Sequence, residues 1–127
     1  MKLLLLVLLM FSLVSCTKQN EDKMNVTSIG QISGEWQWIS TCGGIVESCN
    51  YASDTTYAVI DFGSNGKYVE LHNGTVYMEA DYIIVKANET SGRLRFSGQK
   101  YESSVSIVNN KLEIGRGELV DTYKKIN

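Results

Sequence analysis

Few side chains in this 127-residue chain could carry out acid–base or nucleophilic chemistry. The only histidine, His72, precedes the turn-forming pair Asn73-Gly74, which favours a solvent-facing turn residue over a general base. The sequence contains no Gly-x-Ser-x-Gly elbow, calcium loop, phosphate-binding loop or dinucleotide fingerprint. We therefore expect no catalytic residues, no metal and no cofactor, and the chain is not predicted to be an enzyme.

The carboxylates are scattered through the chain and form no motif. Most are expected to be solvated on the outer faces of strands: Glu70, Glu79, Asp81, Glu113 and Asp121. Asp61 differs because it lies within an apolar segment. A buried Asp61 or Glu79 paired with a second carboxylate in a cleft would reopen the possibility of an enzyme.

The start of the chain indicates export. Met1-Lys2 precedes an almost wholly apolar run, residues 3–13, which has the length of a signal-peptide core and is too short to span a membrane. Directly after it, Leu13-Val14-Ser15-Cys16 resembles a bacterial lipobox, in which a signal peptidase cuts before the cysteine. The resemblance implies a signal peptide at 1–15, a lipid on Cys16 and attachment to the outer membrane, at its periplasmic face or the cell surface. An ordinary secreted protein with a coincidental cysteine is the alternative.

The segment after the lipobox is polar. Residues 17–23 are too poor in apolar side chains to pack, so residues 16–33 are predicted to form a lipidated flexible tether and residues 34–127 the folded domain. Loss of residues 1–15 leaves 112 residues, and the formal charge changes from −2 to −3 because Lys2 is lost. A slightly acidic domain lacks the basic surface of a nucleic-acid-binding protein.

Two cysteines remain once Cys16 is assigned to the lipid. In an oxidising envelope, Cys42 and Cys49 are expected to form a disulfide. A zinc site is the alternative, but it needs four ligands and the chain has one histidine.

The elements that must position these residues are strands. From residue 34 onward, apolar and polar residues alternate with a period of two, and turn signals recur every several residues. Eight strands are expected, at residues 35–39, 57–62, 67–71, 75–86, 93–97, 105–107, 112–114 and 119–126. The segment 75–86 could also be two short strands that meet near Ala80-Asp81.

The connections between the strands predict their pairing. Asn73-Gly74 is suited to a type I′ hairpin turn, and Asn109-Asn110 forms a second turn. All connections are short except the first, residues 41–55, so neighbouring strands should pair antiparallel in an up-and-down meander. Closure into a barrel removes the two free edges of such a sheet. The predicted fold is thus an all-β, eight-stranded antiparallel barrel, with a β-sandwich as the alternative.

The domain resembles known proteins in several short motifs. Gly34-Glu35-Trp36 resembles the Gly-x-Trp that opens the first strand of lipocalins, and the long first connection matches their largest loop. The paired tryptophans, the turn at residues 40–45 and the ending Tyr123-Lys124-Lys125-Ile126 resemble the small lipocalin-like lipoproteins of Bacteroidetes. Lipocalins pack an arginine of the last strand over the first tryptophan, and here only Arg116 or Lys124 could replace it. The short chain also puts a deep ligand cavity in doubt.

The aromatic residues bear on function. Trp36 and Trp38 are two positions apart, so both should leave the same face of one strand. An eight-stranded barrel is wide enough either to be filled by its own side chains or to hold one small ligand. The sequence is therefore compatible with two kinds of interior: a packed core with a shallow mouth, or an internal pocket.

Two functions follow from these expectations. The first is a non-catalytic, membrane-anchored module that binds a small hydrophobic or amphipathic ligand near the barrel mouth, with Trp36, Trp38, Tyr57 and Tyr68 as candidate contacts. The alternative is a protein-interaction module, either an inhibitor or an accessory subunit of an envelope complex.

Overall fold

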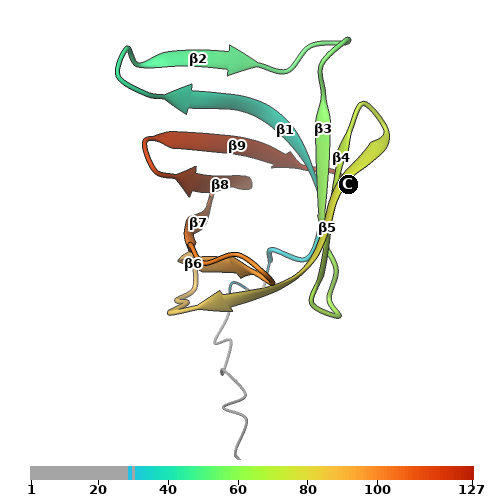
Figure 1. Cartoon of the computed structure of the whole chain (residues 1–127), viewed down its shortest axis with the longest axis vertical. Coiled ribbons are helices and arrows are strands. Elements are labelled where there is room, and N and C mark those ends of the chain that lie inside the picture. The colour runs from blue at the N-terminus through green and yellow to red at the C-terminus, as the bar shows by residue number, and fades with distance from the viewer. Residues whose placement is uncertain (1–28, 30) are drawn as a thin grey trace, which may run out of the picture.

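The computed structural model describes residue 29 and residues 31–127 (Figure 1). The predicted signal peptide, Cys16 and most of the predicted tether lie outside the described residues. In the part that is described, no helix is long and apolar enough to cross a membrane.

The described chain folds into one sheet of nine strands, as Figure 1 shows. The strands are β1 (Gly34–Gly43), β2 (Ser48–Tyr51), β3 (Ala58–Phe62), β4 (Lys67–His72), β5 (Thr75–Val85), β6 (Ser91–Phe96), β7 (Ser103–Val108), β8 (Lys111–Arg116) and β9 (Leu119–Lys125). Strand β5 is continuous through Ala80-Asp81, so the segment is one long strand and not two.

The sheet closes into a barrel. From β3 to β9 each strand pairs antiparallel with the next, and β1 pairs with both β3 and β9. The eight strands β1 and β3–β9 thus form a closed antiparallel meander of lipocalin-like topology, as the sequence predicts. The pairing of β1 with β9 rules out the β-sandwich alternative.

The ninth strand corrects the prediction for the first connection. Residues 41–55 were expected to be a loop, but β1 extends to Gly43 and turns back into β2. Strand β2 pairs only with the last four residues of β1, at the top of Figure 1. All four of its residues are exposed, so β2 has no apolar face from which the sequence could predict it.

The predicted turns are confirmed by their backbone. Asn73 and Gly74 have φ values of 49° and 81°, and Asn109 and Asn110 have 53° and 59°. Positive φ at both central residues is the type I′ geometry that fits the twist of a two-stranded hairpin. These residues therefore set the register of β4 against β5 and of β7 against β8.

One end of the barrel is packed with side chains. Its core contains Trp36, Ile60, Phe62, Tyr68, Leu94, Val105 and Leu112. Ile29 and Ile32 are buried against the same core, and the Trp36 indole N–H donates to the Ile32 carbonyl at 2.7 Å. Ile29 and Ile32, which precede β1, therefore pack against the barrel.

On two strands the inward-facing row of side chains changes from apolar to polar. On β8, Leu112 and Ile114 are buried and Arg116 follows two positions later. On β4, buried Tyr68 is followed by Glu70 and then His72. Because side chains of one face repeat every two residues, each of these rows runs from the packed end toward the other end of the barrel, which we call the open end.

Candidate functional site

The open end of the barrel contains a cavity of about 500 Å³. Its wall comes from β1, β3, β4, β5, β8 and β9, together with residues just before β3, the β4–β5 turn and the connection between β6 and β7. The lining residues are Trp38, Thr41, Thr56, Tyr57, Ala58, Glu70, His72, Asn73, Tyr77, Met78, Gln99, Arg116, Asp121 and Tyr123. We call this space the open-end cavity.

A bulge in β1 builds one wall of the open-end cavity. Trp38 lies opposite Tyr123 of β9, but the next pair is Ser40 with Thr122, so Ile39 is an extra residue. The bulge changes the alternation along β1, and Thr41 therefore lies opposite Asp121. Trp38, Thr41, Asp121 and Tyr123 all line the cavity as a result.

Asp121 is the centre of the polar contacts on this wall. Its carboxylate is 3% exposed and forms an ion pair with Arg116, and the Thr41 hydroxyl donates to its other oxygen. The Trp38 indole N–H donates in turn to Thr41 Oγ1 at 3.1 Å. Burial lowers the pKa of the Arg116 guanidinium, but the Asp121 carboxylate outweighs it and holds that pKa above its usual value. Asp121 thus fixes Arg116 and Trp38 together.

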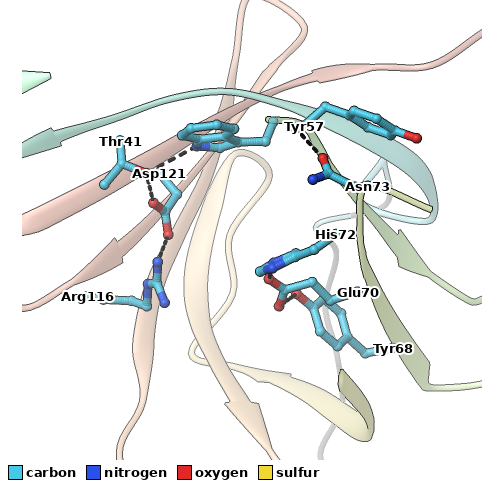
Figure 2. A network of polar contacts seen from close by, with 9 residues as sticks. Thr41, Tyr57, Tyr68, Glu70, His72, Asn73, Arg116 and Asp121 are labelled. Carbon is cyan, nitrogen blue, oxygen red and sulfur yellow. Dashed lines mark hydrogen bonds and ion pairs between the residues drawn. The ribbon is translucent and has the colours of Figure 1, made fainter. Parts of the chain in front are cut away.

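The facing wall carries a second group of polar contacts, on β4 (Figure 2). Glu70 Oε1 lies 2.6 Å from His72 Nε2, and the Tyr68 hydroxyl donates to Glu70 Oε2 at 3.0 Å. Burial, and after it the charge of Glu70, raises the pKa of Tyr68 far above its ordinary value, so its hydroxyl stays protonated and available to donate. Glu70 is therefore held by donors on both oxygens whenever His72 Nε2 carries a proton.

A second bulge brings another ring to this wall. On the β4–β5 pair, Glu70 lies opposite Met78 and Leu71 opposite Val76, which leaves Tyr77 as the extra residue. Tyr77 stacks on His72 with ring centroids 4.2 Å apart and an angle of 6° between the planes. The side chain of Tyr77 is still 69% exposed, so one face of the stacked pair remains accessible.

Tyr57 is held at the rim by the turn after β4. Its backbone N–H donates to Asn73 Oδ1 at 3.0 Å, and its carbonyl accepts from the Asn73 N–H at 3.0 Å (Figure 2). The Asn73 side-chain amide also donates to the Thr55 carbonyl at 3.2 Å. The type I′ turn therefore fixes both the β4–β5 hairpin and the position of Tyr57.

The four candidate contacts divide between the two ends of the barrel. Trp38 and Tyr57 line the open-end cavity. Trp36 and Tyr68 face the same interior but lie in the packed core, where Trp36 is 1% exposed. Trp36 and Trp38 do share one face of β1, as their spacing predicts. The cation over Trp36 is Lys125, 4.5 Å from the ring centroid, and not Arg116 or Lys124.

The carboxylate predictions are correct in part. Glu79, Asp81 and Glu113 are exposed, as expected, but Asp121 is buried and Glu70 is partly buried. Asp121 shares a face with Tyr123 two residues later, and this spacing was the available signal for an inward position. His72 is exposed beside its turn, as predicted, yet its contacts with Glu70 and Tyr77 make it part of the cavity wall.

The β1–β2 hairpin ends beside the cavity and is cross-linked. Cys42 and Cys49 lie directly opposite each other and form a disulfide, as predicted. A side chain at Gly43, whose φ is 125°, would bring a Cβ to 2.0 Å from the Glu118 carbonyl oxygen. The hairpin therefore packs closely on the β8–β9 turn.

The described residues contain no group of three or more His, Cys, Asp or Glu that could hold a metal ion. A hollow of similar volume lies at the packed end, around Trp36 and Lys125, but fewer aromatic rings line it. Compared with protein-family models, with curated proteins and with solved structures, the chain gives no significant match. The functional conclusions therefore depend on the open-end cavity itself.

Proposed function

We propose that this protein is a lipid-anchored, non-enzymatic binding protein that captures a small amphipathic molecule in the open-end cavity. The observation that carries the proposal is that five rings and two pairs of charged groups gather around this cavity of about 500 Å³, whereas one aromatic ring lines the hollow of similar volume at the packed end. Small-molecule pockets occupy about 300–1,000 Å³ and combine aromatic walls with a few fixed polar groups. The open-end cavity has both properties.

The composition of the wall favours an amphipathic ligand over a wholly apolar one. Trp38, Tyr57, Tyr77 and Tyr123 offer aromatic surface. The cavity also contains the Arg116–Asp121 ion pair and the Glu70–His72 pair. A ligand that buried these groups without hydrogen-bonding to them would lose several kcal/mol of binding free energy. A ligand with both polar and apolar surface fits both sets of groups.

Binding without catalysis is supported by how the charged groups are used. Asp61 is only partly buried, Glu79 is exposed, and neither lines the cavity. The carboxylates that do line it are engaged, Asp121 by Arg116 and Glu70 by Tyr68 and His72. Such contacts hold these groups in place as ligand contacts.

The anchor is supported by the lipobox resemblance at residues 13–16 and by the wider resemblance to small lipocalin-like lipoproteins of Bacteroidetes. Attachment would be to the outer membrane, at the periplasmic face or the cell surface. Metabolic labelling with a fatty-acid analogue tests it: label is expected on the wild type and absent from Cys16→Ser. Equal labelling of both would remove the anchor from the proposal.

Ligand capture is tested with the fluorescent probe N-phenyl-1-naphthylamine and with retinol. Either should quench tryptophan fluorescence in a saturable way, and Trp38→Ala should weaken the affinity at least tenfold. Tyr101→Ala is the matched control, since Tyr101 is 85% exposed and lies outside the cavity. If neither these probes nor any small polar ligand binds saturably, the proposed function is wrong.

A protein-interaction role is the second candidate, and the tip of the β1–β2 hairpin favours it. Ile45 and Val46 are 97% and 84% exposed at the end of an arm fixed by the Cys42–Cys49 disulfide. Rigid apolar side chains of this kind lose little entropy when they enter a pocket on a partner. An envelope protein captured in a one-to-one ratio by the wild type and lost with Ile45→Ser/Val46→Ser would favour this role.

A further inference from the structure

We infer that the open-end cavity recognises a neutral carbohydrate, with a sugar ring stacked on its aromatic wall and the hydroxyls bound by its polar groups. This inference deepens the proposed function and depends on the same cavity. It rests on three features of the lining: its balance of charge, its aromatic surface and its mixture of hydrogen-bond donors and acceptors.

The charged groups of the cavity are already paired, which disfavours ionic ligands. The cavity contains two carboxylates, Asp121 and Glu70, and the guanidinium of Arg116, which faces Glu70 from the other wall (Figure 2). Arg116 is bound by Asp121, and Glu70 by Tyr68 and His72. An ionic ligand would have to break one of these pairs to gain a partner of opposite charge, whereas an uncharged ligand can bind while every pair stays in place.

The aromatic surface suits a sugar ring. Five rings line the cavity, from Trp38, Tyr57, His72, Tyr77 and Tyr123. The face of an aromatic ring carries partial negative charge and attracts the partially positive edges of its neighbours. The C–H groups on one face of a pyranose also carry partial positive charge, so they are attracted to the face of an aromatic ring in the same way. The accessible His72–Tyr77 stack and Tyr57 at the rim provide flat surfaces where the ligand enters.

The polar groups supply donors and acceptors together. Arg116 can only donate, Glu70 and Asp121 can only accept while ionised, and the side-chain amides of Asn73 and Gln99 do both. A sugar hydroxyl is itself one donor and two acceptors, so adjacent hydroxyls can satisfy this mixed set.

The wall is also held in position before a ligand arrives. Arg116 is fixed by Asp121, Asp121 by Thr41, and Glu70 by Tyr68. Ligand groups therefore meet side chains that need little further ordering, which lowers the entropic cost of binding. Among the residues that the structure describes, no lysine lines this cavity, so its charged donor is the fixed guanidinium of Arg116.

The experiment titrates the full chain with neutral di- and trisaccharides of glucose, galactose, mannose and xylose, and follows binding by calorimetry and by tryptophan fluorescence. Oligomers of glucosamine and of galacturonic acid serve as cationic and anionic counterparts, and N-phenyl-1-naphthylamine as the apolar probe. At least one neutral saccharide should bind saturably and at least tenfold more tightly than its charged counterparts.

Variants locate that binding in the cavity. Tyr57→Ala and Tyr77→Ala should each weaken saccharide affinity at least tenfold, whereas Tyr101→Ala should change it less than twofold. Tyr77 is largely exposed, so Tyr77→Ala tests the site even if Tyr57→Ala disturbs the fold. Tyr57→Phe and Tyr77→Phe, which keep the ring, should retain most of the affinity.

The outcomes separate the inference from the proposed function. If N-phenyl-1-naphthylamine binds but no neutral saccharide does, the carbohydrate inference is overturned and capture of an amphipathic ligand stands. Tighter binding of a charged oligomer also overturns the inference, as does saccharide binding that neither Tyr57→Ala nor Tyr77→Ala changes. If nothing binds, both proposals fail.

Discussion

Thr41 lies opposite Asp121 because β1 contains one residue more than β9 between the Trp38–Tyr123 pair and the Ser40–Thr122 pair. Without this bulge, Ser40 would face the interior in place of Thr41. The Thr41 hydroxyl would then not reach the buried carboxylate, and Trp38 would lose the oxygen to which its indole N–H donates. A single inserted residue thus links the first and last strands of the barrel through a polar contact inside the open-end cavity.

Removal of the Asp121 carboxylate should destabilise the protein. Asp121→Ala breaks the ion pair with Arg116 and the hydrogen bond from Thr41, and we expect the free energy of unfolding to fall by about 2 kcal/mol. Urea denaturation measures this change. The matched control is Asp81→Ala, which breaks an exposed ion pair with Lys67 and should cost about 0.5 kcal/mol or less. Equal losses would show that Asp121 is not a structural centre.

Lys125 should contribute more to stability than its neighbour Lys124. Its ammonium lies over the Trp36 ring and donates to the carbonyls of Gln31 and Ser33, which hold the residues before β1 against the barrel. We expect Lys125→Met to lower the free energy of unfolding by about 1 kcal/mol. Lys124→Met, at an exposed position on the outer face, is the control, and thermal unfolding of both variants compares them. A larger loss from Lys124→Met would contradict the assignment.

The disulfide should stabilise the hairpin and, with it, the whole domain. Cys42 and Cys49 are seven residues apart, and closing a loop of this length contributes about 2–3 kcal/mol on the chain-entropy model. The double variant Cys42→Ala/Cys49→Ala should therefore unfold at a lower urea concentration than the oxidised wild type. Reduction of the wild type should give nearly the same shift, and a reductant should leave the double variant unchanged.

The contribution of Glu102 to stability should depend on pH. A hydrogen bond from Arg95, assisted by the charge of Arg95, holds the pKa of Glu102 below its usual value. A carboxylate with a lowered pKa in the folded state stabilises the protein above its unfolded pKa of about 4.3, and this stabilisation is lost as the pH falls through the folded value. Glu102→Gln should thus be less stable than the wild type at pH 7 and equal to it in strong acid.

Urea denaturation of Glu102→Gln and the wild type between pH 2 and pH 8 follows this convergence. Glu89→Gln, at an exposed loop position, provides a reference that changes the net charge equally. A stability difference for Glu102→Gln that stayed constant over the whole range would show that the ion pairs with Arg93 and Arg95 are not its source.

The fold could be predicted from local signals because each signal acts over a few residues. The period of two fixes strands, and Asn73-Gly74 and Asn109-Asn110 fix tight reversals through their positive φ values. Short connections then leave few ways to arrange the strands other than a meander. Strand β2 escaped prediction because all four of its residues are exposed, so its pairing with β1 leaves no hydrophobic pattern.

The candidate site was less predictable because it depends on two bulges. The extra residues Ile39 and Tyr77 change which side chains face inward, and neither bulge is marked by a glycine. The burial of Asp121 also depends on two partners that lie on other strands. Arg116 is on β8, and Thr41 is on β1, 80 residues earlier in the sequence. Trp38 and Tyr57 could be selected from residue type alone, but the division of the interior into packed and open ends could not.

That division gives the barrel a practical use. Tyr57, Tyr77 and Gln99 line the cavity and contribute little to the buried core, so they could be randomised together while the apolar rows of β3, β6, β7 and β8 keep the scaffold folded. A display library built on these three positions would sample new specificities within one unchanged frame. Asp121 and Arg116 would have to be kept, because a buried carboxylate without its partner would destabilise the frame.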